Sequence, residues 1–306
     1  MRILITGGTG FIGRHLVTRL LHQQHEITVL TRKPESAQAL FDNRVSTWTS
    51  LTSWHPSIQF DAVINLAGEP IIDKPWTNKR KQVIAASRID LTSKLVNAMT
   101  QAQFKPSVFL SGSAIGIYGD AGTRLCSELT PPATDYGSQL CNEWENTALH
   151  AQALGVRTCL LRTGLVLHRS GGLLKKLYLP FSLGLGSQLG SGQQMMSWIH
   201  LDDYLDAVLF LLENPACHGA YNLTSPHPVS NSVFTTTFAQ SLSKPVLFKT
   251  PAWLIKLLLG QRAVLLLGGQ NVLPAHLLAE GFEFKLPYLR DALDATRLLT
   301  SAINPK

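Results

Sequence analysis

The sequence predicts an α/β protein, a doubly wound parallel sheet with a smaller C-terminal cap. In the first half, short apolar runs alternate with amphipathic segments, and this alternation is typical of βαβ units in a parallel sheet. Because βαβ crossovers are right-handed, helices are expected on both faces of the sheet. Beyond about residue 165, stretches rich in glycine and proline interrupt the alternation, which indicates a differently built cap.

The expected elements follow in order along the chain. Strands are expected at 2–6, 26–31, 44–48, 61–66, 107–111 and 156–163, and helices at 11–24, 76–100 and 135–153. A later helical pattern runs from Asp202 to Glu213, and an acidic residue at its start is favoured by the helix dipole. Residues 219–225 are expected to return to the sheet as one more strand.

Length and composition fit this organisation. The chain has 306 residues, of which 45% are hydrophobic and 15% charged, so disorder and a coiled coil are excluded. A chain of this length buries a core without needing disulfides or structural metals. We expect residues 1–165, completed by about 197–225, to form the sheet domain, and residues 166–196 with 226–306 to form the cap.

The charge distribution and the hydropathy pattern argue against a nucleic-acid partner and against a membrane partner. The net charge is +7, but the 27 lysines and arginines are scattered and their densest cluster is only Lys79–Lys81, so we expect no nucleic-acid partner. The most apolar stretch, 252–267, is interrupted by Lys256, Gln261 and Arg262. It is too broken for a span of about 20 apolar residues, and we expect no membrane partner.

The cysteines and the N-terminal segment predict a cytoplasmic protein. The segment Met1–Thr6 lacks the cleavage site of a signal peptide. His22 and His25 lie three residues apart without a third ligand nearby, so no metal site is expected. The cysteines form no CxxC pair and are expected to be reduced and mostly buried. They are Cys126, Cys141, Cys159 and Cys217.

The glycine-rich segment 7–13 is the strongest functional signal. It directly follows the first expected strand and opens the first expected helix, which is the context in which GxGxxG binds a dinucleotide. Glycine permits the tight turn and lets the backbone approach a pyrophosphate, while the helix N-terminus offers free N–H groups. We therefore expect a Rossmann domain whose cofactor contacts include Gly7, Thr9, Gly10, Phe11, Ile12 and Gly13.

The end of the second strand favours NADP over NAD. An NAD-binding protein usually places an acid there for the ribose hydroxyls, whereas this chain has Thr31, Arg32 and Lys33. Arg32 can make a forked contact with a 2′-phosphate, and Lys33 adds positive charge. The alternative for Arg32 is an ordinary solvated surface cation.

At this point the chain resembles an extended or atypical short-chain dehydrogenase/reductase. The glycine spacing of 7–13 matches that superfamily. Asn65–Gly68 resembles its motif after strand four, and Ser111–Ala114 resembles its serine motif after strand five. The pair Tyr118–Gly119 follows at the expected distance.

A closer resemblance covers nearly the whole chain. It is to the family named for nucleoside-diphosphate-sugar epimerases, whose activity is largely unassigned. The phrases that carry it lie at 65–69, 87–89, 161–164, 197–203, 219–226 and 281–284. The resemblance implies further cofactor contacts at Ser50, Leu51, Ala67, Gly68, Glu69 and Thr163.

The catalytic pattern that the resemblance implies is incomplete. Superfamily chemistry uses a serine and a tyrosine, with a lysine one helical turn after the tyrosine to lower its pKa. Ser113 and Tyr136 fit two of these positions, but Leu140 stands where the lysine is expected. Arg88 occupies roughly the place of an accessory asparagine and could supply the missing charge. The alternatives are that Tyr136 only packs, and that Arg88 is a surface group or binds a ligand phosphate.

The substrate side also departs from the nucleotide-sugar pattern. Many relatives place an arginine before the Asp-Asp helix, where it grips a diphosphate, and Met196 stands at that position here. Lys175 or Lys176 could compensate, although each could equally be a solvated cation. Nucleotide sugars are therefore disfavoured, and the expected substrate is an unknown small molecule.

Two functions remain open at this level. The first is an NADP-dependent oxidoreductase or epimerase-like enzyme with an altered proton relay that uses Ser113, Tyr136 and Arg88. The second is an NADPH-binding sensor without turnover. The missing lysine favours the sensor, and the retained Ser113 with a formed cap favours the enzyme. The apolar runs 253–259 and 263–267 are expected to cover the core of the cap, and a homodimer seam is the alternative for them.

Overall fold

The structure, a computed structural model, describes residues 1–298 and is built on a seven-stranded sheet. All seven strands are parallel, in the order β12-β7-β5-β4-β1-β2-β3. The order reverses between β1 and β4, the switch point at which doubly wound folds bind their ligands. The strands are β1 (Arg2–Thr6), β2 (Glu26–Leu30), β3 (Ser46–Trp48), β4 (Ala62–Asn65), β5 (Val108–Ala114), β7 (Arg157–Thr163) and β12 (Gly219–Leu223).

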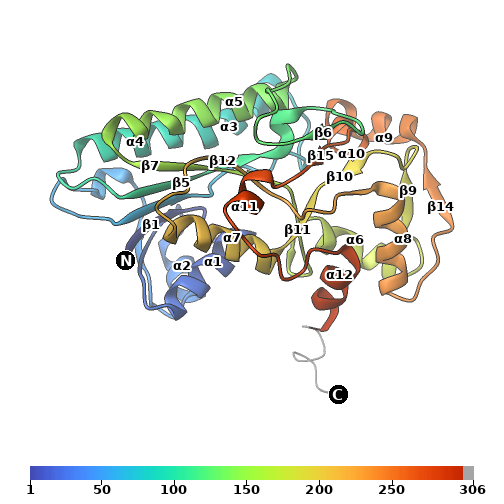
Figure 1. The fold of residues 1–306 in the computed structure, drawn as a ribbon, viewed down its shortest axis with the longest axis horizontal. Helices are drawn as coiled ribbons and strands as arrows, with labels where there is room; N and C mark the ends of the chain where they lie inside the picture. The colour runs from blue at the N-terminus through green and yellow to red at the C-terminus, as the bar shows by residue number, and fades with distance from the viewer. Residues whose placement is uncertain (299–306) are drawn as a thin grey trace.

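Helices cover both faces of the sheet, so the predicted fold class is confirmed (Figure 1). Successive strand residues face opposite sides, and in β1 Ile3 and Ile5 join one core cluster while Leu4 joins the other. The first cluster packs against α1 (Phe11–His22) and α7 (Leu201–Glu213). The second packs against α4 (Leu91–Gln101), α5 (Tyr136–Leu149) and η4 (His150–Leu154).

A third core cluster lies outside the sheet and holds the cap together. Trp198, Phe181 and Phe234 are buried in it, where elements far apart in the sequence meet. These elements include β8 (Leu165–His168), α6 (Gly172–Ser182), β11 (Trp198–His200), α8 (Asn231–Ser241) and α12 (Leu289–Leu298). Figure 1 shows α6, α8, α12 and β11 to one side of the sheet.

Short strand pairs tie the remaining cap segments to one another and to the loop that follows β5. Each pair joins residues far apart in the sequence. The pairs are β8 with β11, β9 (Ser187–Leu189) with β14 (Phe248–Thr250), β10 (Met195–Met196) with β13 (Val229–Ser230), and β6 (Leu125–Cys126) with β15 (Asn271–Val272). The other short elements are α2 (Pro34–Leu40), η1 (Leu51–Ser53), η3 (Ile115–Tyr118), α9 (Ala252–Leu259), η5 (Gly260–Ala263), α10 (Val264–Leu267) and α11 (Ala275–Ala279).

The expected helix at 76–100 is interrupted. It consists of α3 (Asn78–Ala85), a π-helical turn (Ala86–Asp90) and α4. A π turn widens a helix by one residue and is common at functional sites. This turn carries Arg88, which the sequence singled out.

The expectation for the apolar cap runs is wrong in part. Only Ile255 and Ala263 within these runs are buried. Trp253, Leu257 and Leu258 are 66%, 74% and 68% exposed. Helix α9 is apolar on nearly all sides but packs through the side that carries Ile255, so the apolar residues on its other sides stay exposed. Among residues 1–298, no helix combines the length and the apolar character that crossing a bilayer requires.

Candidate functional site

The glycine loop forms a cradle that no residue with a Cβ atom could form. Gly7 has φ +70°, and a Cβ there would lie 2.7 Å from the carbonyl carbon of Leu66. A Cβ on Gly13 would lie 2.1 Å from the carbonyl oxygen of Gly7. The loop is closed by the Gly10 N–H, which donates to that same oxygen at 2.9 Å. Glycine at positions 7 and 13 therefore lets the loop pack against the segment after β4 and against itself, which brings the N-terminus of α1, a site suited to a pyrophosphate, to the carboxyl edge of the sheet.

The helix that follows the loop is suited to an anion. Helix α1 has no acidic residue in its first turn, and its N-cap residue, Gly10, makes no side-chain cap. Its first N–H groups therefore keep their partial positive charge for a ligand. The contacts predicted for Gly7, Thr9, Gly10, Phe11, Ile12 and Gly13 remain predictions, and all six residues lie in or next to this cradle.

The segment after β4 is held against the glycine loop by buried hydrogen bonds. Thr6 Oγ1 donates to Asn65 Oδ1 at 2.6 Å and accepts from the Ala67 N–H at 3.2 Å. Asn65 Nδ2 in turn donates to Thr92 Oγ1 on α4 at 2.8 Å. These bonds fix Ala67 and Gly68 at the switch point, where the sequence placed cofactor contacts.

Arg32 and Glu69 come together beside this point, although 37 residues separate them in the chain. Arg32 follows β2 with its side chain 92% exposed, and its Nη2 lies 3.5 Å from Glu69 Oε1. Arg80 of α3 holds the other oxygen of Glu69 at 3.2 Å. Thr31 Oγ1 accepts the Lys33 N–H at 3.2 Å and shapes the turn that presents Arg32.

The other predicted cofactor residues lie at the carboxyl ends of their strands. Ser50 follows β3 and caps η1 by accepting the Thr52 N–H, and Leu51 is the first residue of that turn. Thr163 ends β7, and its hydroxyl lies 3.1 Å from the Tyr204 hydroxyl. These three residues are correctly placed for the prediction, which nothing in the structure tests further.

Arg88 is fixed at the edge of the sheet rather than exposed on a helix surface. Its Nη2 donates to the carbonyl of Glu69 at 3.1 Å, and its guanidinium stacks 5.4 Å from the ring of Trp144. A Cβ on Gly68 would lie 3.0 Å from Arg88 Cζ, so the glycine makes room for it. Burial lowers the pKa of Arg88, and the opposing effect of the nearby Cys141 is smaller, so the net shift is downward.

Tyr136 lies near Arg88 but is not activated as a base. Burial raises the pKa of Tyr136, and the charges of Arg88 and Arg80 only partly oppose this. Its ring packs 5.1 Å from Trp76, and its hydroxyl donates to the Lys81 carbonyl at 3.4 Å. Leu140, one helical turn beyond Tyr136, is buried and supplies no charge that would lower this pKa.

Ser113 is hydrogen-bonded to Glu145 and not to Tyr136 or Arg88. Its hydroxyl is buried and donates its only proton to Glu145 Oε1 at 2.6 Å. Within residues 1–298, no hydrogen bond or ion pair joins Ser113 to Tyr136 or Arg88. The structure therefore brings Arg88 and Tyr136 together and leaves Ser113 able only to accept from a substrate.

Glu145 and Arg162 form a buried ion pair that sequence reasoning missed. Arg162 Nε and Nη2 each donate to Glu145 at 2.8 Å, and Arg162 Nη1 donates to the Tyr118 hydroxyl at 2.9 Å. Burial alone would lower the pKa of Arg162, but the bonds to Glu145 outweigh it and raise the pKa. A charged residue inside the apolar run of 159–163 was the signal that could have revealed this pair.

Three histidines meet beneath the glycine loop. Ser170 Oγ lies 3.0 Å from His15 Nε2 and 2.7 Å from His168 Nδ1. The rings of His168 and His200 are 6.2 Å apart, and His200 Nδ1 accepts the Asp202 N–H at the start of α7. Within the described chain, 1–298, no group of three or more histidine, cysteine or acidic side chains is arranged to hold a metal ion.

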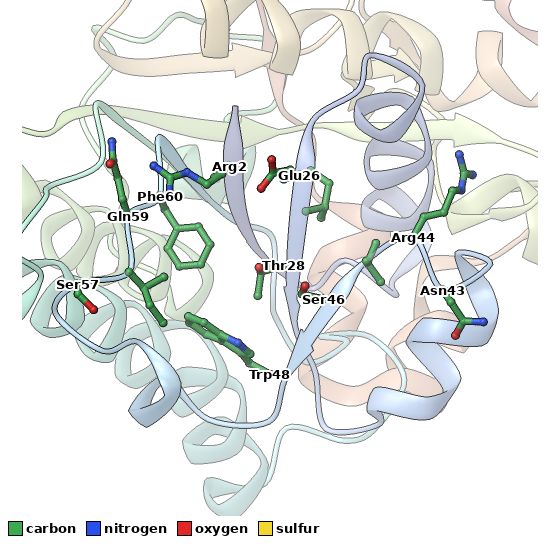
Figure 2. Close-up of a pocket in the computed structure, with 13 residues that line it drawn as sticks. Arg2, Glu26, Thr28, Asn43, Arg44, Ser46, Trp48, Ser57, Gln59 and Phe60 are labelled. Atoms are coloured by element: carbon green, nitrogen blue, oxygen red, sulfur yellow. The ribbon is translucent and has the colours of Figure 1, made fainter.

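A hollow of about 600 Å³ lies at the amino ends of the strands, away from these residues (Figure 2). Arg2, Glu26 and Ser46, the first residues of β1, β2 and β3, line it together with Trp48 and Phe60. The connection from β3 to β4 holds only the short η1, so this part of the sheet face has no covering helix. None of the predicted cofactor or catalytic residues lines this hollow.

The fold and the edge just described define a class: an α/β protein with the fold of NAD(P)-dependent epimerases and short-chain dehydrogenases. The profile of the NAD dependent epimerase/dehydratase family matches residues 3–224. A domain of unknown function, DUF1731, matches residues 250–296. The chain therefore belongs to the NAD dependent epimerase/dehydratase family, which confirms the resemblance drawn from the motifs.

Full-length relatives agree with this assignment. A chloroplastic homolog of the epimerase family protein SDR39U1 from Arabidopsis thaliana is 40% identical over 301 residues, 96% of this chain and 86% of the relative. An epimerase family protein of Staphylococcus epidermidis is 37% identical over 294 residues, 96% of this chain and 98% of the relative. The crystal structure of human epimerase family protein SDR39U1 with NADPH matches at a TM-score of 0.88 and 33% identity, covering 97% of this chain and 99% of that one.

Proposed function

We propose that this protein binds NADP(H) at the carboxyl edge of the sheet and reduces or epimerises a small molecule there. The glycine loop at the start of α1 carries the proposal, because Gly7 and Gly13 let it pack tightly and the uncapped N–H groups that follow suit a pyrophosphate. Arg32 follows β2, where proteins of this fold distinguish the two nucleotides, and the human relative was crystallised with NADPH. Both observations support NADP over NAD.

NADPH, when bound, supplies the hydride. Because its pKa is raised, Tyr136 stays protonated at neutral pH and acts as an acid that donates its phenol proton. Arg88 holds a positive charge beside the phenol and stabilises the phenolate that this donation leaves. Ser113, whose own proton is bound to Glu145, cannot donate to the carbonyl oxygen and instead accepts a hydrogen bond from a hydroxyl elsewhere on the substrate. This set of roles favours reduction of a carbonyl over oxidation of an alcohol.

The alternative is an NADPH-binding sensor without turnover. Two observations favour it: Leu140 replaces the lysine of the usual relay, and Ser113 is buried with its proton already bound. The fold would then report the state of the nicotinamide pool to a partner instead of transforming a substrate.

One experiment separates the two functions. Purified protein is titrated with NADPH by calorimetry and then incubated with NADPH and a broad panel of aldehydes and ketones, while nicotinamide absorbance is followed. Turnover that Tyr136→Phe abolishes supports the enzyme. Tight NADPH binding with no turnover across the panel supports the sensor, and no heat with NADPH or NADH rejects both.

We also propose that the protein works in the cytoplasm, acts on a small molecule, forms a homodimer and binds no nucleic acid. Four cysteines that are buried and unpaired suit a reducing compartment. Fractionation of cells that express the tagged chain tests the location.

A further inference from the structure

Two opposite charges lie at the place where the two pyridine nucleotides differ. Arg32 Nη2 and Glu69 Oε1 are 3.5 Å apart, one on the turn after β2 and the other on the segment after β4. NAD-binding relatives of this fold read the ribose 2′-hydroxyl with an acid at the end of β2, a position that is Arg32 here. The structure thus supplies an acid at the same place from a different strand.

The carboxylate of Glu69 is fixed by Arg80, which binds the oxygen that does not face Arg32. Arg80 is only 11% exposed, and it binds Glu69 Oε2 at 3.2 Å and the Pro70 carbonyl at 2.6 Å. The backbone of Glu69 is bound as well, with its N–H donating to Ser87 Oγ at 3.0 Å and its carbonyl accepting from Arg88 at 3.1 Å. Arg32, in contrast, is 92% exposed, so little packing holds its side chain in place beside Glu69.

We propose that Glu69 is a specificity-determining residue that limits how strongly the protein prefers NADPH to NADH. This inference rests on the proposed binding of NADP(H). With NADH bound, Glu69 Oε1 accepts a hydrogen bond from the ribose 2′-hydroxyl. With NADPH bound, the 2′-phosphate takes Arg32 away from Glu69 and is repelled by the carboxylate. Arg80 keeps that repulsion small because it neutralises the other carboxylate oxygen.

The proposal predicts opposite effects for substitutions of Glu69 and of Arg80, which binds Glu69. Glu69→Gln removes both the strong acceptor and the repulsion, so the ratio of the NADH Kd to the NADPH Kd rises by about tenfold. Arg80→Gln leaves the carboxylate unneutralised, so NADPH binds more weakly, NADH is little changed and the ratio falls. A ratio measured on one protein sample does not depend on the fraction that is folded.

The experiment is calorimetric titration of the purified full chain and its variants with NADPH and with NADH. Glu35→Gln is the matched control, because Glu35 is exposed on α2 three residues beyond Arg32 and the substitution removes the same charge. The inference holds if the ratio rises for Glu69→Gln, falls for Arg80→Gln and stays within about twofold for Glu35→Gln.

Other outcomes are equally informative. An equal change in both affinities for Glu69→Gln, or a shift for Glu35→Gln as large as that for Glu69→Gln, overturns the inference but leaves NADP(H) binding intact. If the unaltered protein binds neither nucleotide, the proposed function fails and the inference falls with it.

Discussion

At the scale of single residues, the chemistry depends on which protons are already bound. Burial raises the pKa of Tyr136, so the phenol is an acid at neutral pH. For a donor with a raised pKa, reduction should persist through the ordinary tyrosine pKa of 10.0 and decline only at higher pH.

Tyr136→Phe tests this role directly. We expect the rate of NADPH-dependent carbonyl reduction to fall by about 100-fold or more, because a positioned general acid contributes on that order. The NADPH Kd should stay unchanged, since the phenol supplies a proton rather than affinity. The two are measured by initial rates at saturating NADPH and by calorimetry. If the rate for the unaltered protein already declines as the pH rises toward 8, the acid role is contradicted.

The Glu145–Arg162 pair gives a second prediction at this scale. Both side chains are buried, so Arg162→Met leaves the carboxylate of Glu145 without its partner and should cost about 3–5 kcal/mol of unfolding free energy. Lys176→Met, which breaks the exposed pair with Asp73, should cost less than about 1 kcal/mol. Urea denaturation of the two variants measures both values. Similar costs for the two would show that the buried pair is not a stability determinant.

These residues also show what the sequence could not reveal. The sequence placed Ser113 just after the fifth strand and Arg88 on a continuous helix, whereas β5 extends through Ser113 and Arg88 lies on a π-helical turn. It could not show that Ser113 is bound to Glu145, because 32 residues separate them and no local pattern links a strand hydroxyl to a helix carboxylate. The pairing of Arg32 with Glu69 was hidden for the same reason, although each residue had been assigned to the cofactor separately.

At the scale of elements, the segment between β4 and α3 connects the sheet domain to the cap. Arg262 of η5 donates to the Ile72 carbonyl at 2.7 Å, and Lys176 of α6 binds Asp73 at 2.6 Å. The same segment holds Glu69 at one end and Trp76, which packs on Tyr136, at the other. Its position therefore affects the cofactor edge and the phenol together.

Removing one of these links should loosen the segment without unfolding the protein. Arg262→Met removes a buried donor, so the local opening free energy of 70–76 should fall by about 1–3 kcal/mol. Hydrogen–deuterium exchange should then be faster in that segment and unchanged in β1 and β5. Lys256→Met on exposed α9 is the matched control and should change neither. Faster exchange across the whole chain would instead indicate global destabilisation.

Elements differed in how well the sequence predicted them. The seven strands of the sheet and its longer helices were predicted because each carries its own hydrophobic period, whereas the seven-residue α2 was not predicted. The short cap strands, such as β10 and β15, are two residues long and exist only through partners at Val229–Ser230 and Leu125–Cys126. Pairings of that length have no hydrophobic periodicity to detect. The sequence therefore predicted where the cap lies in the chain but not which of its strands pair.

At the scale of the whole molecule, the exposed apolar face of α9 bears on assembly. Because Trp253, Leu257 and Leu258 project outward from the cap, this face is the candidate seam of the proposed homodimer. If it is the seam, Leu257→Glu should shift the sedimentation coefficient from dimer to monomer and leave the NADPH Kd unchanged. Leu40→Glu, on α2 of the sheet domain, is the control, since Leu40 is 47% exposed away from the cap. A monomeric unaltered protein at micromolar concentration would remove the seam from consideration.

The histidine cluster sets how the stability of the whole molecule depends on pH. Burial lowers the pKa of His200 from 6.5 to about 4, and burial and the charge of His168 lower that of His15 to about 4. Between pH 6.5 and 4 the unfolded chain therefore binds protons that the folded protein excludes, so stability is full above about pH 6.5 and is lost as the pH falls toward 4.

The size of this effect can be measured. His200 alone should account for a loss on the order of 3 kcal/mol across this window, and the partly exposed His15 for less. His200→Asn keeps an acceptor for the Asp202 N–H but cannot be protonated, so its urea midpoint should fall less steeply with pH than that of the unaltered protein. His55→Asn, on an exposed loop, should leave the slope unchanged. Equal slopes for His200→Asn and the unaltered protein would show that acid sensitivity arises elsewhere, and the cluster would then have only a packing role.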